Sequence, residues 1–576
     1  MNTSNVNFNV CVELTFGTPF DPLPNDRATA DKLVAGELTL APHPSWRMPR
    51  QLHWGENPFG EINWVAQYHM MRWIDPLRRT FVATGDQSYM VRWLELAESW
   101  IDANPPGRGK AAYSWADMVE AGRAMTFAFG LPQLQQAGLS GVDKVSESLA
   151  QHGDWLADPS KIRTGNHALQ QHQGLLVIGA ALGRNDWVDL AIQRSSQMLL
   201  TAYDEEGINE EGALQYHQIN YTWWNQLRRR IEIVRGSAPS EFGRIERATD
   251  GLLHSLRPDG AYELIGDTEI FRPRLDLTPE LKYATTGGAE GRQPRETLKV
   301  FSAGYIFGRS GWGDESRPMS GESFYSVRFG PQNRIHGHVD GTSLTLFCRG
   351  ESILADTGKY AYDHKDPVRA FVAGRSGHNS VELEGVEYDR ESVVTLESND
   401  SRRTLQLFVL KDIGYDEHKL IRTLLIDLEM GFVVVIDHVE GPLKARAKQN
   451  WHLGKTFSHR KESSNVLAKS AANRVWISPS DVSYPMSVVA GKTAPVQGWL
   501  SESWRQKVKS RVVEISSSEV NSYIATLVDF SGTETPPSIS VHFSERDQMM
   551  TVTITRNLAV YLIVLRNGRI DSYIHL

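Results

Sequence analysis

The hydrophobic period of the chain changes near residue 290, and this change limits the fold more than any other feature. Between about residues 60 and 270 the apolar residues recur with a helical period, as Val145 and Leu149 do. The segment from Leu169 to Leu182 is apolar on nearly all sides, which predicts an inner helix that stops at Gly183. We therefore expect helix pairs packed as a toroid or an incomplete barrel.

Beyond this point the sequence has the pattern of strands. Residues 285–296 are rich in glycine and polar residues and are typical of a linker. From 342 to 348 apolar and polar residues alternate, residues 423–436 predict a hairpin, and Asn567-Gly568 is a strong signal for a two-residue turn. These patterns predict an α+β, multidomain protein. Residues 1–290 would form an N-terminal (α/α) toroid, and residues 291–576 a C-terminal antiparallel β-sandwich.

Composition excludes several classes of protein. A formal net charge of -8 argues against a nucleic-acid binder, which needs a basic surface. The two cysteines, Cys11 and Cys348, exclude a cysteine-rich zinc module, so any metal must be bound by histidine and carboxylate. The sequence has neither a signal peptide nor a run of 18 apolar residues, which predicts no membrane segment and a cytoplasmic location. A periplasmic or secreted location follows instead if a leader has been removed.

A histidine pair precedes the alternating strand. His336 and His338 are two residues apart, so in an extended segment both imidazoles point to one face. Asp356 and His378 follow in the same β-rich region, and His338, Asp356 and His378 form a three-ligand set suited to zinc. The alternative is that the two histidines lie in a surface loop.

A second polar group lies in the helical half. Asn166 and His167 are at the start of the predicted inner helix, and Tyr216 and Tyr221 follow about fifty residues later. An amide can bind a carboxylate, and histidine or tyrosine can transfer a proton. The alternative is that Asn166 caps the helix while the two tyrosines are buried core residues.

Taken together, these segments resemble the heparinase II/III-like polysaccharide lyases, a family with a helical toroid and an antiparallel β-sandwich. The resemblance covers roughly residues 115–385. It is carried by GNH at 165–167, QYH at 215–217, HGHVDGTSL at 336–344, ILADTGKYAYD at 353–363 and RSGHNSVELEG at 375–385, with a weaker similarity in WADMVEAGR at 115–123.

The resemblance implies a role for each matched residue. Asn166 would bind and neutralise the substrate carboxylate together with His336, and Tyr216 would transfer the proton at C5 or O4. His167 is the other acid/base candidate, and Tyr221 competes with Tyr216. His338, Asp356 and His378 would bind a structural Zn²⁺. Further contacts to the substrate are expected from Tyr221, Tyr360, Tyr362, Arg369, Arg375 and Asn379.

The expected function is that of a carbon–oxygen lyase. It would cleave an acidic polysaccharide or oligosaccharide containing uronic acid by β-elimination and leave a 4,5-unsaturated uronate end. Which uronan it takes, whether it acts within the chain or at an end, and whether it is a homo-oligomer stay open. One alternative is a glycoside hydrolase, which needs two carboxylates. Its candidates are Glu205, Glu206, Glu210, Glu211 and Asp340. The other alternative is a non-catalytic glycan-binding accessory protein.

Overall fold

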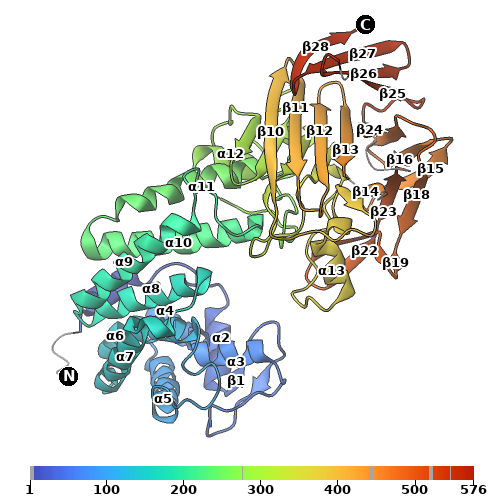
Figure 1. Cartoon of the computed structure of the whole chain (residues 1–576). Coiled ribbons are helices and arrows are strands. Elements are labelled where there is room, and N and C mark those ends of the chain that lie inside the picture. Colours follow the sequence, from blue (N-terminus) through green and yellow to red (C-terminus); the bar gives the residue numbers. More distant parts are fainter. Residues whose placement is uncertain (1–5, 276, 442–445, 518–522, 545) are drawn as a thin grey trace. The chain divides into compact units, whose positions relative to one another are not determined.

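The chain packs as two compact units (Figure 1). The computed structural model describes residues 6–275, 277–441, 446–517, 523–544 and 546–576. One unit consists of Met1–Ala202 and Asn220–Ile245, and the other of Tyr203–Ile219 and Glu246–Leu576. The first unit is helical and the second is mostly antiparallel sheet, which confirms the predicted toroid-plus-sandwich fold. The division into domains at residue 290 stays a prediction.

Two almost fully buried helices form the centre of the helical unit. They are α6 (Val119–Gln136) and α8 (Gly165–Ala181). A Cβ on Gly174 of α8 would lie 2.8 Å from the Cβ of Ala121 on α6, so glycine allows the two helices to approach closely. The end of α8 just before Leu182 and Gly183 confirms the predicted inner helix and its stop.

Most of the other helices belong to the helical unit, whereas the residues of α10 and α11 are divided between the two units and α12 belongs to the second unit. In chain order, the other helices are α1 (Phe8–Leu14), α2 (Asp26–Val34), α3 (Ile62–Met70), α4 (Asp75–Thr84), α5 (Gln87–Ala103), α7 (Val142–Ala157), α9 (Asn185–Ala202), α10 (Leu214–Arg235), α11 (Gly243–His254) and α12 (Pro279–Thr285). A short two-stranded sheet is formed by β1 (Glu37–Leu38) and β2 (Trp46–Arg47). The segment after α12 has no helix before the first strand of the sandwich, as the predicted linker requires.

Two large antiparallel sheets form the sandwich of the second unit. The first contains, in spatial order, β15 (Ser458–Glu462), β16 (Asn465–Lys469), β17 (Arg474–Pro479), β24 (Tyr523–Asp529), β13 (Phe432–Glu440), β12 (Lys419–Asp427), β11 (Leu405–Asp412), β10 (Val393–Arg402) and β6 (Gly330–Pro331). The second contains β18 (Met486–Ala490), β23 (Arg511–Ser516), β14 (Ala447–Leu453), β8 (Glu351–Leu354), β7 (Leu344–Cys348), β5 (Phe324–Arg328), β4 (Tyr305–Arg309) and β3 (Leu298–Phe301), with β9 (Val381–Leu383) paired to β14.

A third sheet covers the outer face of the first one. It consists of β25 (Ser538–Ser544), β26 (Met549–Arg556), β27 (Ala559–Arg566) and β28 (Arg569–His575). Leu424 and Ile426 of β12 pack in the core between the two large sheets, while Leu425 packs in the core under the third sheet. A strand that is buried on both faces needs apolar residues at successive positions, which explains the run TLLI in the predicted hairpin of β12 and β13.

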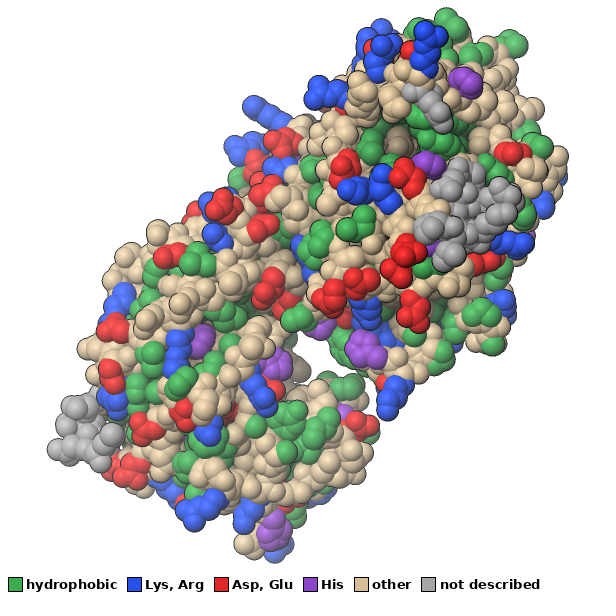
Figure 2. Space-filling model, in the orientation of Figure 1, with side chains coloured by type: hydrophobic (Ala, Val, Ile, Leu, Met, Phe, Trp, Pro, Cys, Tyr) green, Lys and Arg blue, Asp and Glu red, His purple; other side chains and the backbone are tan. Residues whose placement is uncertain are grey.

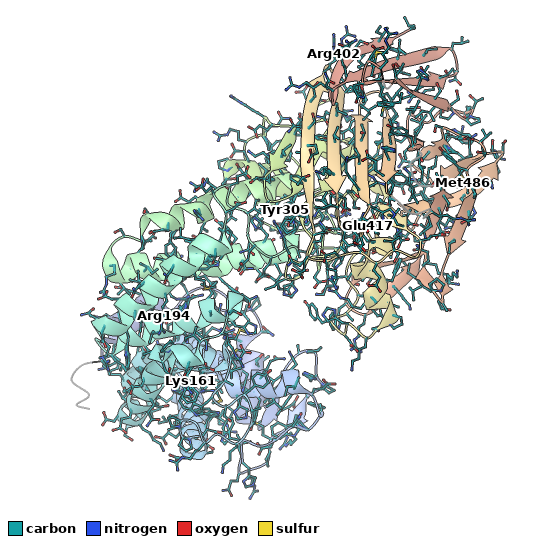
Figure 3. All side chains as sticks on the ribbon, viewed as in Figure 1. Lys161, Arg194, Tyr305, Arg402, Glu417 and Met486 are labelled. Atoms are coloured by element: carbon teal, nitrogen blue, oxygen red, sulfur yellow. The ribbon has the colours of Figure 1, made fainter. Side chains whose placement is uncertain are left out.

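Local signals placed the turns correctly, but the helix within the sandwich was not foreseen. Asn567 and Gly568 both have positive φ, at 51° and 70°, as the turn between β27 and β28 requires. Arg402 of β10, labelled in Figure 3, contacts the backbone of β28. A short helix, α13 (Pro367–Ala373), interrupts the strands and starts with Asp366 as its N-cap.

The surface carries both signs of charge. On the face shown in Figure 2, acidic and basic side chains are interspersed over the chain. Among the described helices, none has the length and apolar character needed to cross a bilayer.

A buried ion pair joins the sandwich core to the loops above it. Arg422 of β12 and Asp437 of β13 face each other across the strands and form two hydrogen bonds of 2.7 and 2.8 Å. The same guanidinium donates to the carbonyls of Thr342 and Asn379 at 2.9 and 2.7 Å. Both side chains of the pair are fully buried, so each charge depends on its partner.

We predict that Arg422→Ala lowers the free energy of unfolding by about 3–5 kcal/mol, because it leaves the Asp437 carboxylate buried without its partner. Urea denaturation measures the change. Arg460→Ala is the control, because the Arg460–Glu462 pair is exposed and should matter by less than about 1 kcal/mol. Equal effects of the two variants would contradict this account of the pair.

Candidate active site

An aromatic pair marks the polar site of the second unit. Tyr216, in the first turn of α10, stacks on His336 with ring centroids 3.5 Å apart and ring planes 9° apart. The Tyr216 hydroxyl lies 2.5 Å from that of Tyr362. Burial raises the pKa of Tyr216 well above its usual range, and the hydrogen bond with Tyr362 adds to the rise. Tyr216 is therefore a protonated phenol at neutral pH.

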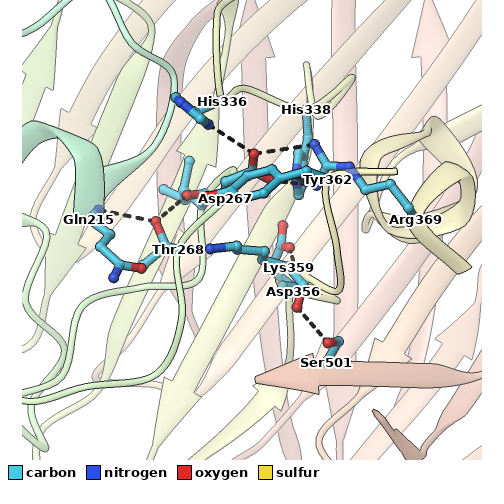
Figure 4. Close-up of polar contacts among 12 residues, drawn as sticks. Gln215, Asp267, Thr268, His336, His338, Asp356, Lys359, Tyr362, Arg369 and Ser501 are labelled. Atoms are coloured by element: carbon cyan, nitrogen blue, oxygen red, sulfur yellow. Dashed lines mark hydrogen bonds and ion pairs between the residues drawn. The ribbon is translucent and has the colours of Figure 1, made fainter. Parts of the chain in front are cut away.

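One buried carboxylate, that of Asp267, organises the groups around this pair (Figure 4). His336 Nδ1 lies 3.1 Å from Asp267 Oδ2, and His338 Nε2 lies 3.0 Å from Asp267 Oδ1. The guanidinium of Arg369 on α13 also donates to both oxygens of Asp267. Burial alone would raise the pKa of Asp267, but the hydrogen bonds from His336 and His338 outweigh it and hold that pKa well below its usual range.

Close packing of three loops brings these residues together. His336 has a φ of 57°, and its carbonyl accepts the backbone N–H of Asp267 at 2.8 Å. Gly266, with a φ of 60°, lies beneath this contact. A Cβ there would lie 2.5 Å from the Gly212 carbonyl oxygen and 2.6 Å from that of His336. Only glycine allows the three backbone segments to approach this closely.

The residues predicted to bind metal come together. His338, Asp356 and His378 are all buried, and each offers a ligand atom within 4.8 Å of the others. His378 Nδ1 lies 2.9 Å from Asp356 Oδ2. In the described part of the chain, His338 Nδ1 and His378 Nε2 are buried ring nitrogens without a hydrogen-bond partner. Two imidazoles and a carboxylate with unsatisfied donor atoms suit a divalent cation, so this group could hold a metal ion.

The residues predicted to contact substrate have different environments in the second unit. Tyr362 is 41% exposed and Tyr360 is partly exposed, whereas Arg369 is buried against Asp267. Arg375 is also buried, and it donates to the carbonyl of Gly341 and pairs with Asp412. Asn379 is fully buried and bonds backbone groups of Ala355 and His452. These contacts give Arg375 and Asn379 a structural role, and their contact with substrate stays a prediction.

In the helical unit, the first turn of α8 presents a second polar group. Asn166 and His167 follow Gly165, and His167 Nδ1 contacts the carboxylate of Asp117. A carboxylate at Nδ1 holds the proton on that nitrogen and leaves Nε2 to exchange a proton elsewhere. Asp117 has a φ of 67°, and its carbonyl accepts the Gln171 amide at 2.9 Å. The structure thus supplies His167 with an orienting partner that sequence reasoning missed.

Glu120 lies beneath this turn with an unusual environment. Gln171 Nε2 donates to Glu120 Oε1 at 2.8 Å, while Glu120 Oε2 is buried without a partner in the described part of the chain. Burial raises the pKa of Glu120 to about 7. The carboxyl is therefore protonated over much of the acidic range.

Tyr221 and Tyr216 differ in their surroundings although both lie on α10. Tyr221 belongs to the helical unit and is only 8% exposed, with Asn225 Nδ2 3.4 Å from its hydroxyl. Tyr216 belongs to the second unit and is half-buried beside His336 and Tyr362. The surroundings favour Tyr216 for proton transfer. Asp267 and Asp117 had no distinctive spacing. The available signals were a lone acid within the apolar segment LIGD for Asp267 and the weak similarity of WADMVEAGR for Asp117.

A helical toroid followed by an antiparallel sandwich, with a buried His–Asp–His group in the sandwich, defines the class of protein. Family models for the heparinase II/III N-terminus and for the heparinase II/III-like C-terminal region match residues 25–272 and 302–542. The chain belongs to the heparinase II/III-like family, which confirms the resemblance in its motifs.

Similar proteins with known names extend over most of the chain. A heparin-sulfate lyase of Bacteroides thetaiotaomicron is 23% identical over 454 residues, which are 70% of this chain and 64% of that protein. A heparin-sulfate lyase of Bacteroides stercoris is 21% identical over 87% of this chain and 81% of its own length. The crystal structure of the heparan sulfate lyase HepC from Pedobacter heparinus superposes with a TM-score of 0.77 at 18% identity, covering 96% of this chain and 92% of that one.

We predict that the stability of the helical unit falls as pH rises from about 4.5 to about 7 because of Glu120. The folded state keeps this proton while the unfolded state releases it, so the raised pKa costs up to about 3 kcal/mol above pH 7. Glu120→Gln should therefore unfold at a higher temperature than the wild type at pH 8, with a smaller difference at pH 5. Parallel pH profiles of the two proteins in thermal unfolding would contradict the assignment.

Proposed function

We propose that this chain is a polysaccharide lyase that cleaves a uronic-acid-containing glycosaminoglycan of the heparan type by β-elimination. The observation that carries the proposal is the protonated Tyr216 phenol stacked on His336, with Asp267 fixing the imidazole. The names of the similar lyases support the reaction and this substrate class. The chain spans only 64% of the length of the first of these relatives. The proposed substrate class therefore also depends on the chemistry of the site residues.

In the proposed reaction, the proton at C5 of the uronate leaves and its bonding electrons form the C4–C5 double bond. The C4–O4 bond breaks, and the leaving O4 takes a proton. Tyr216 suits the acid role because burial keeps its phenol protonated. His167 suits the base role because Asp117 binds its Nδ1 and leaves Nε2 to accept the C5 proton. With these roles, His167 accepts the proton that leaves C5, and Tyr216 donates the proton that O4 takes.

The negative charge that develops on the uronate carboxylate needs hydrogen-bond donors. Asn166 supplies an amide in the first turn of α8, where backbone N–H groups also favour an anion. His336 is proposed as its partner, because Asp267 holds the ring through Nδ1, and the nearest carboxylate to Nε2, that of Glu211, lies 3.9 Å away, beyond hydrogen-bond distance. Charge stabilisation of this kind lowers the barrier to removing the neighbouring C5 proton.

We also propose that His338, Asp356 and His378 hold zinc. The two histidines and one carboxylate form a common zinc set, and the unsatisfied ring nitrogens fit it. A zinc ion there would hold three loops of the sandwich in register, and its chemistry would be structural. The predicted cytoplasmic location and a homo-oligomeric state stay predictions.

Of the five carboxylates of the hydrolase alternative, Asp340 and Glu206 are engaged in other contacts, while Glu211 Oε2 lies 3.9 Å from His336 Nε2. Asp340 is buried in an ion pair with Arg328 at 3.0 Å. Glu206 accepts hydrogen bonds from the backbone and the side chain of Ser302. Neither has the setting of a carboxylate placed across a glycosidic bond.

We predict that Tyr216→Phe lowers kcat by at least about 100-fold on heparan sulfate while binding changes little, because only the transferable proton is lost. The absorbance of the unsaturated uronate measures turnover, and calorimetry measures binding. Tyr221→Phe is the matched comparison and should keep most of the activity. Loss of turnover in Tyr221→Phe alone would move the role to Tyr221. No unsaturated product from heparan sulfate, chondroitin, alginate or glucuronan would contradict the proposed reaction.

For the metal, we predict about one zinc per chain, lost in His378→Ala, together with a fall in the temperature of unfolding on treatment with a chelator. Elemental analysis and calorimetry give the two values. The exposed His459 serves as the control, since His459→Ala should keep its zinc. Wild-type protein without metal, and with an unfolding temperature that chelators do not change, would contradict the zinc proposal.

A further inference from the structure

Two large aromatic side chains lie exposed beside the Tyr216 phenol. Tyr362 and Trp504 each expose 41% of their surface, with ring centroids 5.1 Å apart and planes tilted by 48°. Exposed aromatic rings of this size bury considerable area when a flat ligand covers them. The C–H faces of pyranose rings match such surfaces, because each ring offers an apolar face and hydroxyl groups at its edge.

A charged pair, Lys359 and Glu269, contacts this aromatic pair, and Lys359 and Tyr362 are labelled in Figure 4. The Lys359 ammonium lies 4.7 Å from the centroid of Tyr362 and 5.3 Å from that of Trp504. Its partner is Glu269 Oε1, at 2.9 Å, and the other oxygen of Glu269 accepts the backbone N–H of Trp504 at 3.2 Å. The Lys359 side chain is 7% exposed, so it positions the rings and is not itself available to a ligand.

The backbone of the same residue, Glu269, links the aromatic pair to the proposed acid. The backbone N–H of Glu269 donates to Gln215 Oε1 at 3.0 Å, and Gln215 precedes Tyr216. Together with the 2.5 Å contact between the hydroxyls of Tyr362 and Tyr216, this fixes the aromatic pair relative to the phenol. A sugar stacked on Tyr362 would therefore be adjacent to the sugar whose O4 Tyr216 is proposed to protonate.

A row of basic residues follows Trp504 along the chain. Trp504 lies in the turn between β21 (Trp499–Ser503) and β22 (Gln506–Lys509). Lys507 and Lys509 are exposed two positions apart in β22 and so share one face of the strand, while the exposed Arg505 lies in the turn next to Trp504, with a φ of 52°. The Lys507 ammonium lies 4.7 Å from the centroid of Trp499. Within the described residues, none of the three basic side chains has a carboxylate at ion-pair distance.

We propose that Tyr362 and Trp504 form a sugar-stacking subsite beside Tyr216, and that Arg505, Lys507 and Lys509 bind the anionic groups of sugars further along the same glycan. The proposal rests on the proposed lyase function and adds the ligand chemistry: a polyanionic chain of several sugars that bears carboxylates or sulfates. Three exposed cations on one hairpin attract such a chain, and the two aromatic rings fix its register. The subsite makes affinity depend on the length of the glycan.

The test measures binding directly, so that it does not depend on turnover. Heparan tetrasaccharide and octasaccharide are titrated into the Tyr216→Phe protein by calorimetry, with and without further substitutions. Trp504→Ala should weaken binding of both lengths by about tenfold, and Trp504→Phe should restore most of it. Arg505→Gln with Lys507→Gln should weaken the octasaccharide at least about fivefold and the tetrasaccharide less than about twofold. The same two substitutions should also reduce the slope of log affinity against log salt concentration for the octasaccharide by about two, because two ionic contacts are lost.

Arg566→Gln with Arg569→Gln, on the third sheet, is the control for charge and should change neither affinity. In the otherwise wild-type protein, Trp504→Ala should raise KM for heparan sulfate by about tenfold and leave kcat within about threefold. Unchanged affinities in the Trp504 and hairpin variants, with Tyr216→Phe still inactive, overturn the subsite and leave the lyase proposal intact. Absence of any oligosaccharide binding overturns both. A changed oligomeric state in Trp504→Ala, with normal glycan affinity, assigns the aromatic pair to a contact between copies and overturns the subsite.

Discussion

The buried carboxylate of Asp267 is the group on which the second unit's site depends. It binds His336, His338 and Arg369 at once, so one residue fixes the imidazole under Tyr216, a proposed metal ligand and the helix α13. A carboxylate without these donors would be costly to bury, and the donors without it would lose their orientation. The aromatic stack, the His–Asp–His group and the loop contact over Gly266 therefore form one connected structure.

The helical unit uses the same device with different residues. Asp117 orients His167 from a strained backbone position, and Gln171 holds that position through the Asp117 carbonyl. In both units a carboxylate binds Nδ1 of a histidine and so favours the tautomer with the proton on that nitrogen. Proton transfer in β-elimination needs this control, because the acid and the base must hold opposite protonation states before the reaction begins. In the proposed reaction Tyr216 is the acid, because burial keeps its phenol protonated.

Much of this organisation could be predicted from sequence. The helical period around Leu175, the alternation from 342 to 348 and the Asn567-Gly568 turn depend on local patterns, so the fold class was predicted correctly. The grouping of His338, Asp356 and His378, which could hold a metal ion, was also predicted, because histidines and a carboxylate in one β-rich region restrict the options. The third sheet and α13 were not predicted. The alternation of apolar and polar residues identifies a strand but does not show how many sheets pack against it. Asp267, Asp117, Glu269 and Trp504 act through partners distant in sequence, and residues of these types are too common to single out.

The central claim is that Asp267 organises the proposed active site. Its most direct measurement is the kinetics of Asp267→Asn on heparan sulfate, together with the zinc content and circular dichroism of the same protein. An amide keeps the size of the side chain but loses the charge that His336, His338 and Arg369 share. The account predicts a folded protein whose kcat/KM falls at least about 100-fold. Turnover of Asp267→Asn at the wild-type rate would contradict it.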